Sequence, residues 1–181
     1  SVLPARMISI LREVGLLLSA GLIAYLTLVL KTYNSTDPAW SRQGVTQEVM
    51  NAGGMAGAHT SDVLLYLFGF SAWWIVLAGI LLIMRAYRQT TKEITENSKV
   101  VLLVTAGFIL LVLSSAAFEG LRMYSFAPEL PGEPGGIIGG EIALMSENAF
   151  GFIGSTLILL VLMAAGISLV SGVSWIMVAE K

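Results

Sequence analysis

Few residues of this chain are of the types that carry out covalent or metal chemistry. The sequence has one histidine, His59, and no cysteine, which excludes thiolate catalysis, disulfides and cysteine-based zinc sites. It contains no His-Glu-x-x-His pattern, and the serines in its apolar stretches have no neighbouring histidine or lysine to activate them as nucleophiles. The sequence therefore predicts no catalytic residue, no metal site and no cofactor.

A glycine-rich segment at residues 128–140 is the other feature that could bind a small ligand. Glycine-rich loops can cradle phosphate, but a P-loop requires Gly-Lys-Ser/Thr ahead of a helix, and no lysine in this chain follows a glycine. The segment contains three prolines and five glycines, a density that argues against a regular helix. We therefore predict an irregular loop without a nucleotide site.

Glu119 and Arg122 are the ionisable pair at the end of an apolar stretch. They are three residues apart, a spacing that allows an ion pair on one face of a helix. Their position at the predicted membrane interface favours a structural role for this pair over a catalytic one.

The elements that position these residues follow from the composition. The 181 residues are 56% hydrophobic and 12% charged, whereas a soluble domain carries about 25% charged residues. Four nearly uncharged stretches predict an all-α membrane protein with spans at about residues 14–33, 63–84, 100–118 and 152–177. The first stretch could instead be a signal peptide, but no small-x-small cleavage site follows it, which favours an uncleaved anchor.

The basic residues predict the orientation of these spans. Arg6 and Arg12 precede the first span, and further Lys and Arg residues fill residues 85–99. Because cytoplasmic flanks carry an excess of Lys and Arg, we predict that both termini and the loop at 85–99 lie in the cytoplasm. Two loops, at residues 34–62 and 119–147, then face outward.

The second span is predicted to extend outward as a helix. Thr46 is a suitable N-cap and Glu48 supplies an early negative charge, so this helix would begin near residue 46 and continue into the membrane at residue 63. The net charge of −2 provides no overall basic surface for nucleic acid.

Small residues recur at helical spacing within this outward extension. Gly53 and Gly57 are four residues apart, as are Gly54 and Ala58, so one face carries almost no side chain. Such a face allows a second backbone to approach closely. That backbone could belong to a partner or to another part of this chain.

Two functions are compatible with these features. The first is a membrane anchor and assembly module that works through packing and partner contacts. The second is a channel or transporter whose pore forms only in an oligomer. A polar stripe along one helix would favour the pore, and the apolar stretches contain only scattered serines and threonines.

Short motifs in a fixed order give the chain a resemblance to a known family. It resembles the N-terminal membrane domain of FtsK/SpoIIIE-type bacterial DNA translocases, in the FtsK cell-division form. The matching motifs are Tyr33 to Ser41, Asn51-x-Gly53-Gly54-x-x-Gly57-Ala58, Ser61 to Gly69, Ser71-Ala72, Leu130-Pro131, Gly135-Gly136-x-x-Gly139, Gly151-Phe152-x-Gly154 and Gly172-x-Ser174-Trp175.

The resemblance implies an anchor and septal-targeting domain in the bacterial inner membrane. In this family the membrane domain leads into a long linker and a hexameric ATP-driven DNA motor. Because the sequence stops at Lys181, we expect linker and motor to be absent, with no enzyme activity and no nucleotide or nucleic-acid binding by this chain. The expected partners are lipid, other division-machinery membrane proteins and further copies of the chain; the alternative is a pore subunit for DNA passage through the closing septum.

The predicted partner or packing contacts lie in the two outer loops. The candidate surfaces are the glycine-faced helix of the first loop and the proline- and glycine-rich segment of the second. These residues are Trp40, Gly53, Gly54, Gly57, Asp62, Leu130, Pro131, Gly135, Gly136 and Gly139.

Overall fold

The computed structural model describes residues 5–41, 48–88, 98–123 and 130–172. The regular elements of these residues are helices: α1 (Ala5–Lys31), α2 (Gly54–Phe68), the 3-10 helix η1 (Gly69–Ala72), α3 (Trp73–Arg88), α5 (Ser98–Arg122) and α6 (Gly136–Ser171). Four segments are long and apolar enough to cross a membrane: Ser9–Lys31, Gly54–Tyr87, Val101–Arg122 and Gly136–Ser171. The expectation of an all-helical protein with four such helices is confirmed.

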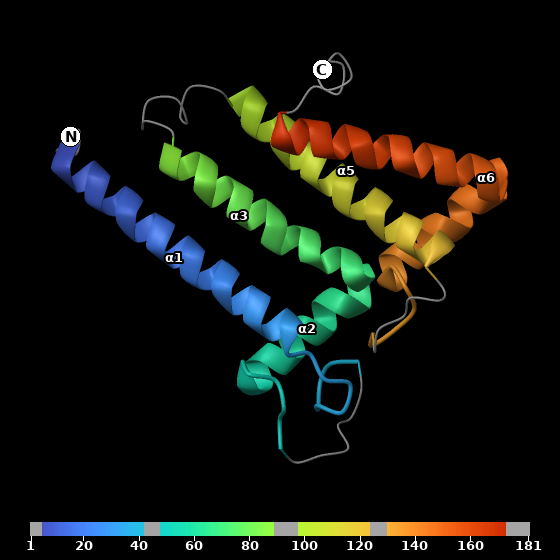
Figure 1. The fold of residues 1–181 in the computed structure, drawn as a ribbon, viewed down its shortest axis with the longest axis horizontal. Helices are drawn as coiled ribbons and strands as arrows, with labels where there is room; N and C mark the ends of the chain where they lie inside the picture. The colour runs from blue at the N-terminus through green and yellow to red at the C-terminus, as the bar shows by residue number, and fades with distance from the viewer. Residues whose placement is uncertain (1–4, 42–47, 89–97, 124–129, 173–181) are drawn as a thin grey trace, which may run out of the picture.

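The helices form two pairs that meet at one end of the molecule (Figure 1). In one pair α1 packs along α3, and in the other α5 packs along α6. The pairs are joined where α2 and η1 contact α5 and α6. The start of α1, the end of α3, the start of α5 and the end of α6 all lie at the opposite end.

Buried apolar side chains form two small clusters rather than one large core. The first is centred on Leu30, Leu65, Ala72 and Val76, and the second on Ala117, Leu121, Ala143 and Leu159. Many other large apolar side chains are exposed, among them Leu17 on α1 and Ile153 on α6. Lipid tails are as apolar as leucine, so a membrane helix has no hydrophobic reason to bury such residues against its neighbours.

The second predicted span differs from the continuous outward helix that the sequence indicates. α2 begins at Gly54, and residues 48–53 are not helical; Thr46 lies outside the described residues. The helix also ends at Phe68, because Gly69 has φ 60° and ψ −146°. This conformation is open to glycine and strained for other residues, so the chain changes direction there before α3 begins.

The segment before the fourth span also differs from its prediction. The prediction that prolines and glycines exclude a helix through residue 140 is wrong, because α6 begins at Gly136, after the last proline of the segment. α6 ends at Ser171, where Gly172 adopts a left-handed conformation with φ 71°. The predicted end at residue 177 lies outside the described residues.

A sharp kink at Gly151 divides α6 into two arms. Gly151 has φ 68° and ψ 169° inside the helix, and Figure 1 shows the chain turning back there. The first arm, residues 136–150, packs near the end of α5, and the second arm, residues 152–171, runs back along it. A straight helix of 36 residues would be about 54 Å long, far more than a bilayer core of about 30 Å, and the kink resolves that mismatch.

The first and third helices are longer than the apolar stretches that predict them. α1 starts at Ala5 rather than near residue 14, and α5 extends to Arg122 rather than residue 118. Hydropathy marks only the part of a helix that lies in hydrocarbon, while Arg, Lys and Glu are good helix formers and continue the helix beyond it. Which end of the molecule faces the cytoplasm stays a prediction.

Candidate functional site

Three helices meet almost backbone to backbone where the two pairs join. The contacts occur at five glycines, which we call the glycine junction: Gly69, Gly120, Gly135, Gly136 and Gly139. A Cβ atom at Gly136 would lie 2.5 Å from the carbonyl carbon of Leu67, and one at Gly135 or Gly139 would overlap the carbonyl oxygen of Ala116. A side chain at these positions would therefore push α2 or α6 away from its neighbour.

Glu119 on α5 is the polar centre of this junction. Its side chain is only 4% exposed, and Oε1 accepts a hydrogen bond from the Phe70 N–H at 2.8 Å. Oε2 accepts from both the N–H and the hydroxyl of Ser71, each at 3.0 Å. The break at Gly69 leaves these N–H groups without partners in a preceding turn. Glu119 therefore caps the second half of the broken helix, where a negative charge also complements the helix dipole.

A chain of hydrogen bonds connects this carboxylate with α3. The Ser71 hydroxyl donates to Glu119, so the Ser115 hydroxyl donates to Ser71 across 2.8 Å. The Trp74 indole N–H in turn donates to Ser115 at 2.9 Å. Each polar group here is satisfied by the next, which matters because an unpaired polar group in an apolar environment is costly.

The predicted ion pair between Glu119 and Arg122 is wrong. Glu119 turns toward η1, whereas the Nε–H of Arg122 donates to Thr156 Oγ1 on α6 at 3.1 Å. The Arg122 guanidinium also lies 4.2 Å from the centroid of the Phe152 ring, a cation–π contact. The two side chains thus bind different neighbours. Glu119 connects α5 with η1 of the other helix pair, and Arg122 connects α5 with α6 of its own pair.

Buried carboxylates also hold the loop between α1 and α2 in place. Asp62 is fully buried and accepts hydrogen bonds from the N–H and the hydroxyl of Ser41, at 2.7 and 2.8 Å. Asp37 accepts from the N–H groups of Met50 and Asn51, at 2.7 and 2.9 Å. The predicted contact residue Asp62 therefore has an internal role in the structure.

The small-residue face of α2 packs against the end of α1. The Asn51 side chain donates to the Val29 carbonyl at 2.9 Å. A Cβ atom at Gly53 would lie 2.5 Å from Val29 Cγ1, and one at Gly57 would overlap Asn51 Oδ1 and lie 2.9 Å from Val29 Cγ1. Gly54 differs, because nothing lies within 4 Å of its Cβ position and its φ is 63°. The close approach expected at Gly53 and Gly57 is thus made by residues of this chain. At Gly54 a glycine is favoured by the positive φ rather than by a close contact.

The remaining predicted contacts differ in exposure. Trp40 is 62% exposed, and its ring packs edge to face on Tyr66 of α2, with centroids 5.4 Å apart and planes at 76°. Leu130 packs against the first apolar cluster and Pro131 is half-buried, whereas Gly135, Gly136 and Gly139 are buried in the junction. A partner role for any of them stays a prediction.

The sequence did not predict the internal contacts of Asp37 and Asn51, nor the hydrogen-bond partners of Glu119. Asp37 and Asn51 are buried and bind backbone groups, but polar residues in a loop have no periodicity that marks them as internal. Glu119 was noticed for its charge and spacing, although its partners lie 48 and 49 residues away. The signal for Asn51 was its place directly before a small-residue face.

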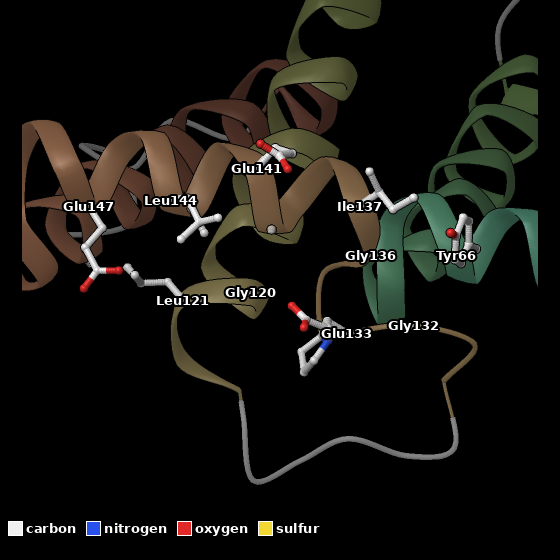
Figure 2. A pocket seen from close by; sticks show the side chains of 13 residues that line it. Tyr66, Gly120, Leu121, Gly132, Glu133, Gly136, Ile137, Glu141, Leu144 and Glu147 are labelled. Atoms are coloured by element: carbon white, nitrogen blue, oxygen red, sulfur yellow. The ribbon is translucent and has the colours of Figure 1, made fainter.

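An open groove of about 350 Å³ lies beside the glycine junction (Figure 2). Its walls come from α2, the end of α5, residues 132–134 and the first arm of α6. Three glutamates line it, Glu133, Glu141 and Glu147. Among the described residues no three His, Cys, Asp or Glu side chains are grouped closely enough to hold a metal ion.

Comparison with known proteins gives a consistent family. The family description "4TM region of DNA translocase FtsK/SpoIIIE" matches residues 9–181. DNA translocase FtsK 2 of Ralstonia nicotianae is 37% identical over 185 residues, covering 99% of this chain and 24% of that protein. DNA translocase FtsK of Shewanella oneidensis is 35% identical over 178 residues, covering 94% of this chain and 18% of the relative.

A third relative, DNA translocase FtsK 1 of Neisseria meningitidis, is 30% identical over 176 residues, covering 96% of this chain and 22% of its own length. The chain thus spans between about a sixth and a quarter of the relatives that it matches. No solved structure matches it. Four apolar helices and this match together identify a multi-pass membrane domain. The chain belongs to the family of four-helix membrane regions of the FtsK/SpoIIIE DNA translocases.

Proposed function

We propose that this chain is the membrane-anchoring and assembly domain of a DNA translocase that couples chromosome segregation to cell division. In this proposal the domain lies in the bacterial inner membrane, is recruited to the division septum, and contacts other division proteins through its outer surface. The observation that carries the proposal is the glycine junction with its Glu119 cap. It joins the two helix pairs through backbone contacts and so builds a fixed outer platform on membrane helices.

The relatives support a division of labour within a longer protein. They are named DNA translocases, and the chain corresponds to 18–24% of the length of the three described above. We assign the membrane attachment to this domain and the DNA-moving activity to the remainder of such proteins. Lipid is then its first partner, since exposed apolar side chains cover α1 and the second arm of α6.

The proposal also includes self-association. Hexamers are implied for the full-length proteins by the resemblance, and the exposed apolar faces of α1 and α6 leave room for contacts between copies as well as with lipid. The pore alternative is less well supported, because the exposed side chains along the second arm include Ile153, Leu157 and Val161, which would form an apolar lumen. Purified protein in planar bilayers should show no conductance, and a stable conductance would favour the pore.

The decisive experiment asks whether this chain alone carries the division function. Cells depleted of their own translocase would receive the chain with a fluorescent tag. We expect septal fluorescence and restored division. Septal fluorescence without division would reduce the domain to a targeting anchor, and diffuse membrane fluorescence would contradict the proposal of septal recruitment.

A matched pair of variants tests whether the junction is needed for this function. Gly135→Leu should abolish complementation while the protein still inserts in the membrane, because the side chain cannot fit against Ala116. Gly15→Leu on α1 should still restore division, because nothing lies within 4 Å of its Cβ position and it lies outside the junction. If the two variants complemented equally well, the junction would not be required for the division function.

A further inference from the structure

We infer that the groove beside the glycine junction is a docking site for a short basic and apolar peptide segment of a partner protein. The inference rests on the proposed function and specifies the chemistry of one partner contact. It places the segment between the first arm of α6, the end of α5 and Tyr66 of α2.

Among the described residues that line the groove, the charged ones are all acidic: Glu133, Glu141 and Glu147. Within the described part of the chain, none of these three carboxylates has a side-chain hydrogen bond or ion pair. The buried carboxylates Glu119 and Asp62 are satisfied internally, whereas the three glutamates of the groove are exposed and accessible to a partner. Cationic groups from outside the chain would complement them.

Apolar side chains lie among these carboxylates. Ile137 and Leu144 on the first arm are 48% and 57% exposed, and Ile137, Glu141 and Leu144 follow a spacing that places them on one helix face. Leu121 of α5 also borders the groove but is 2% exposed, so Ile137 and Leu144 supply most of the apolar surface. Figure 2 shows Leu144 and Glu147 at one end of the groove and Ile137 near Tyr66 at the other. A bound segment therefore meets apolar surface and negative charge alternately.

The geometry selects a peptide over other cationic or apolar ligands. A metal ion needs its carboxylates close together, and the glutamates of the groove do not form such a group. A phospholipid would bring its phosphate toward three negative charges. A volume of about 350 Å³ is at the small end of ligand pockets, which suits a few side chains of an extended segment rather than a folded domain.

Glycine backbone forms part of the lining of the groove. Gly120, Gly136 and Gly140 contribute backbone to it, and the first two belong to the junction that Glu119 caps. A partner segment can therefore approach closely, and little ordering of this chain is needed when it binds. Such preorganisation lowers the cost of association.

Direct binding tests the inference. The purified chain would be placed in nanodiscs of neutral phosphatidylcholine, and fluorescence anisotropy would follow a labelled short peptide with three arginines and two leucines. We expect binding above that of empty nanodiscs, weaker binding at high salt because screening reduces the attraction, and roughly tenfold weaker binding of a peptide with glutamine in place of arginine. Absence of binding above empty nanodiscs, or equal binding of both peptides, would overturn the inference.

Three variants localise the binding to the groove. The triple change Glu133→Gln, Glu141→Gln and Glu147→Gln should weaken binding roughly tenfold. Gly140→Leu leaves the charges intact and fills open space in the groove, so it should weaken binding by a similar factor. Glu13→Gln, an exposed change on α1 outside the groove, is the control and should leave affinity unchanged.

Unaltered affinity of either groove variant, with helicity preserved by circular dichroism, would exclude the groove. The septal experiment reads recruitment in cells and does not depend on this peptide. Peptide binding in the groove can therefore be observed even if the chain does not reach the septum. Septal recruitment can likewise be observed even if the groove binds no peptide.

Discussion

Replacing Gly135 by alanine is the sharpest test of the glycine junction. Gly135 has φ 79° and ψ −5° at the start of α6, and an L-residue in this left-handed conformation costs about 1–2 kcal/mol. Its Cβ atom would overlap the carbonyl oxygen of Ala116 and lie 2.9 Å from the Gly120 nitrogen. Overpacking of a close contact adds about 1–3 kcal/mol, so we expect a total loss of about 2–5 kcal/mol.

Gly140→Ala is the matched control for this change. It introduces the same methyl group five positions later in the same segment, where nothing lies within 4 Å of the Cβ atom. Inside a helix the change from glycine to alanine stabilises by about 1 kcal/mol. The two substitutions should therefore shift the free energy of unfolding in opposite directions.

Unfolding in mixed micelles with increasing sodium dodecyl sulfate provides the measurement. Tryptophan fluorescence sums the signals of four tryptophans, one of which is Trp74, whose indole N–H donates to Ser115 beside the junction. We expect the midpoint of Gly135→Ala to fall well below that of the unaltered chain and that of Gly140→Ala to stay equal or rise. Equal midpoints for Gly135→Ala and the unaltered chain would show that the helices do not approach as described.

Three further substitutions test other contacts. Glu119→Gln exchanges one acceptor oxygen for an amide that faces a backbone N–H, so the same titration should show a loss of about 2–3 kcal/mol, and an unchanged midpoint would refute the cap. Gly151→Ala forces a side chain into φ 68° and ψ 169°, a region used almost solely by glycine, and should cost about 1–3 kcal/mol with faster hydrogen exchange on both sides of the kink; exchange rates that stay the same would contradict this strain. Asp62→Asn weakens the hydrogen bonds to Ser41 and should speed exchange in residues 36–41 while that of α5 stays constant; equal acceleration throughout would point to global unfolding instead.

The number of membrane helices was predictable from the sequence. A bilayer core of about 30 Å needs some 20 apolar residues, and gaps between charged residues of that length are directly visible. The helix ends were less predictable, because charged residues such as Arg6 and Arg122 continue a helix beyond the hydrocarbon. The kink at Gly151 lies within an uncharged stretch, so the hydropathy of the sequence gives no sign of it.

The break at Gly69 was not predictable from its neighbourhood. Residues 63–84 contain no charged residue, and the carboxylate that stabilises the break comes from Glu119, far along the chain. Glycine spacing did mark two positions of close approach, at Gly53 and Gly57, where side chains of Val29 and Asn51 approach. It could not tell whether the approaching group belonged to a partner or to this chain, because both need the same bare surface.

The Glu119 cap has a consequence for the order in which the membrane domain is completed. α1 and α3 emerge from synthesis before α5, and until then the N–H groups of Phe70 and Ser71 lack the carboxylate that binds them. Unsatisfied backbone groups are costly in lipid, so the first helix pair is an unfinished intermediate rather than an independent unit. Glu119 on α5 therefore completes the break between α2 and α3, and the nascent chain forms the glycine junction only when α5 has been inserted.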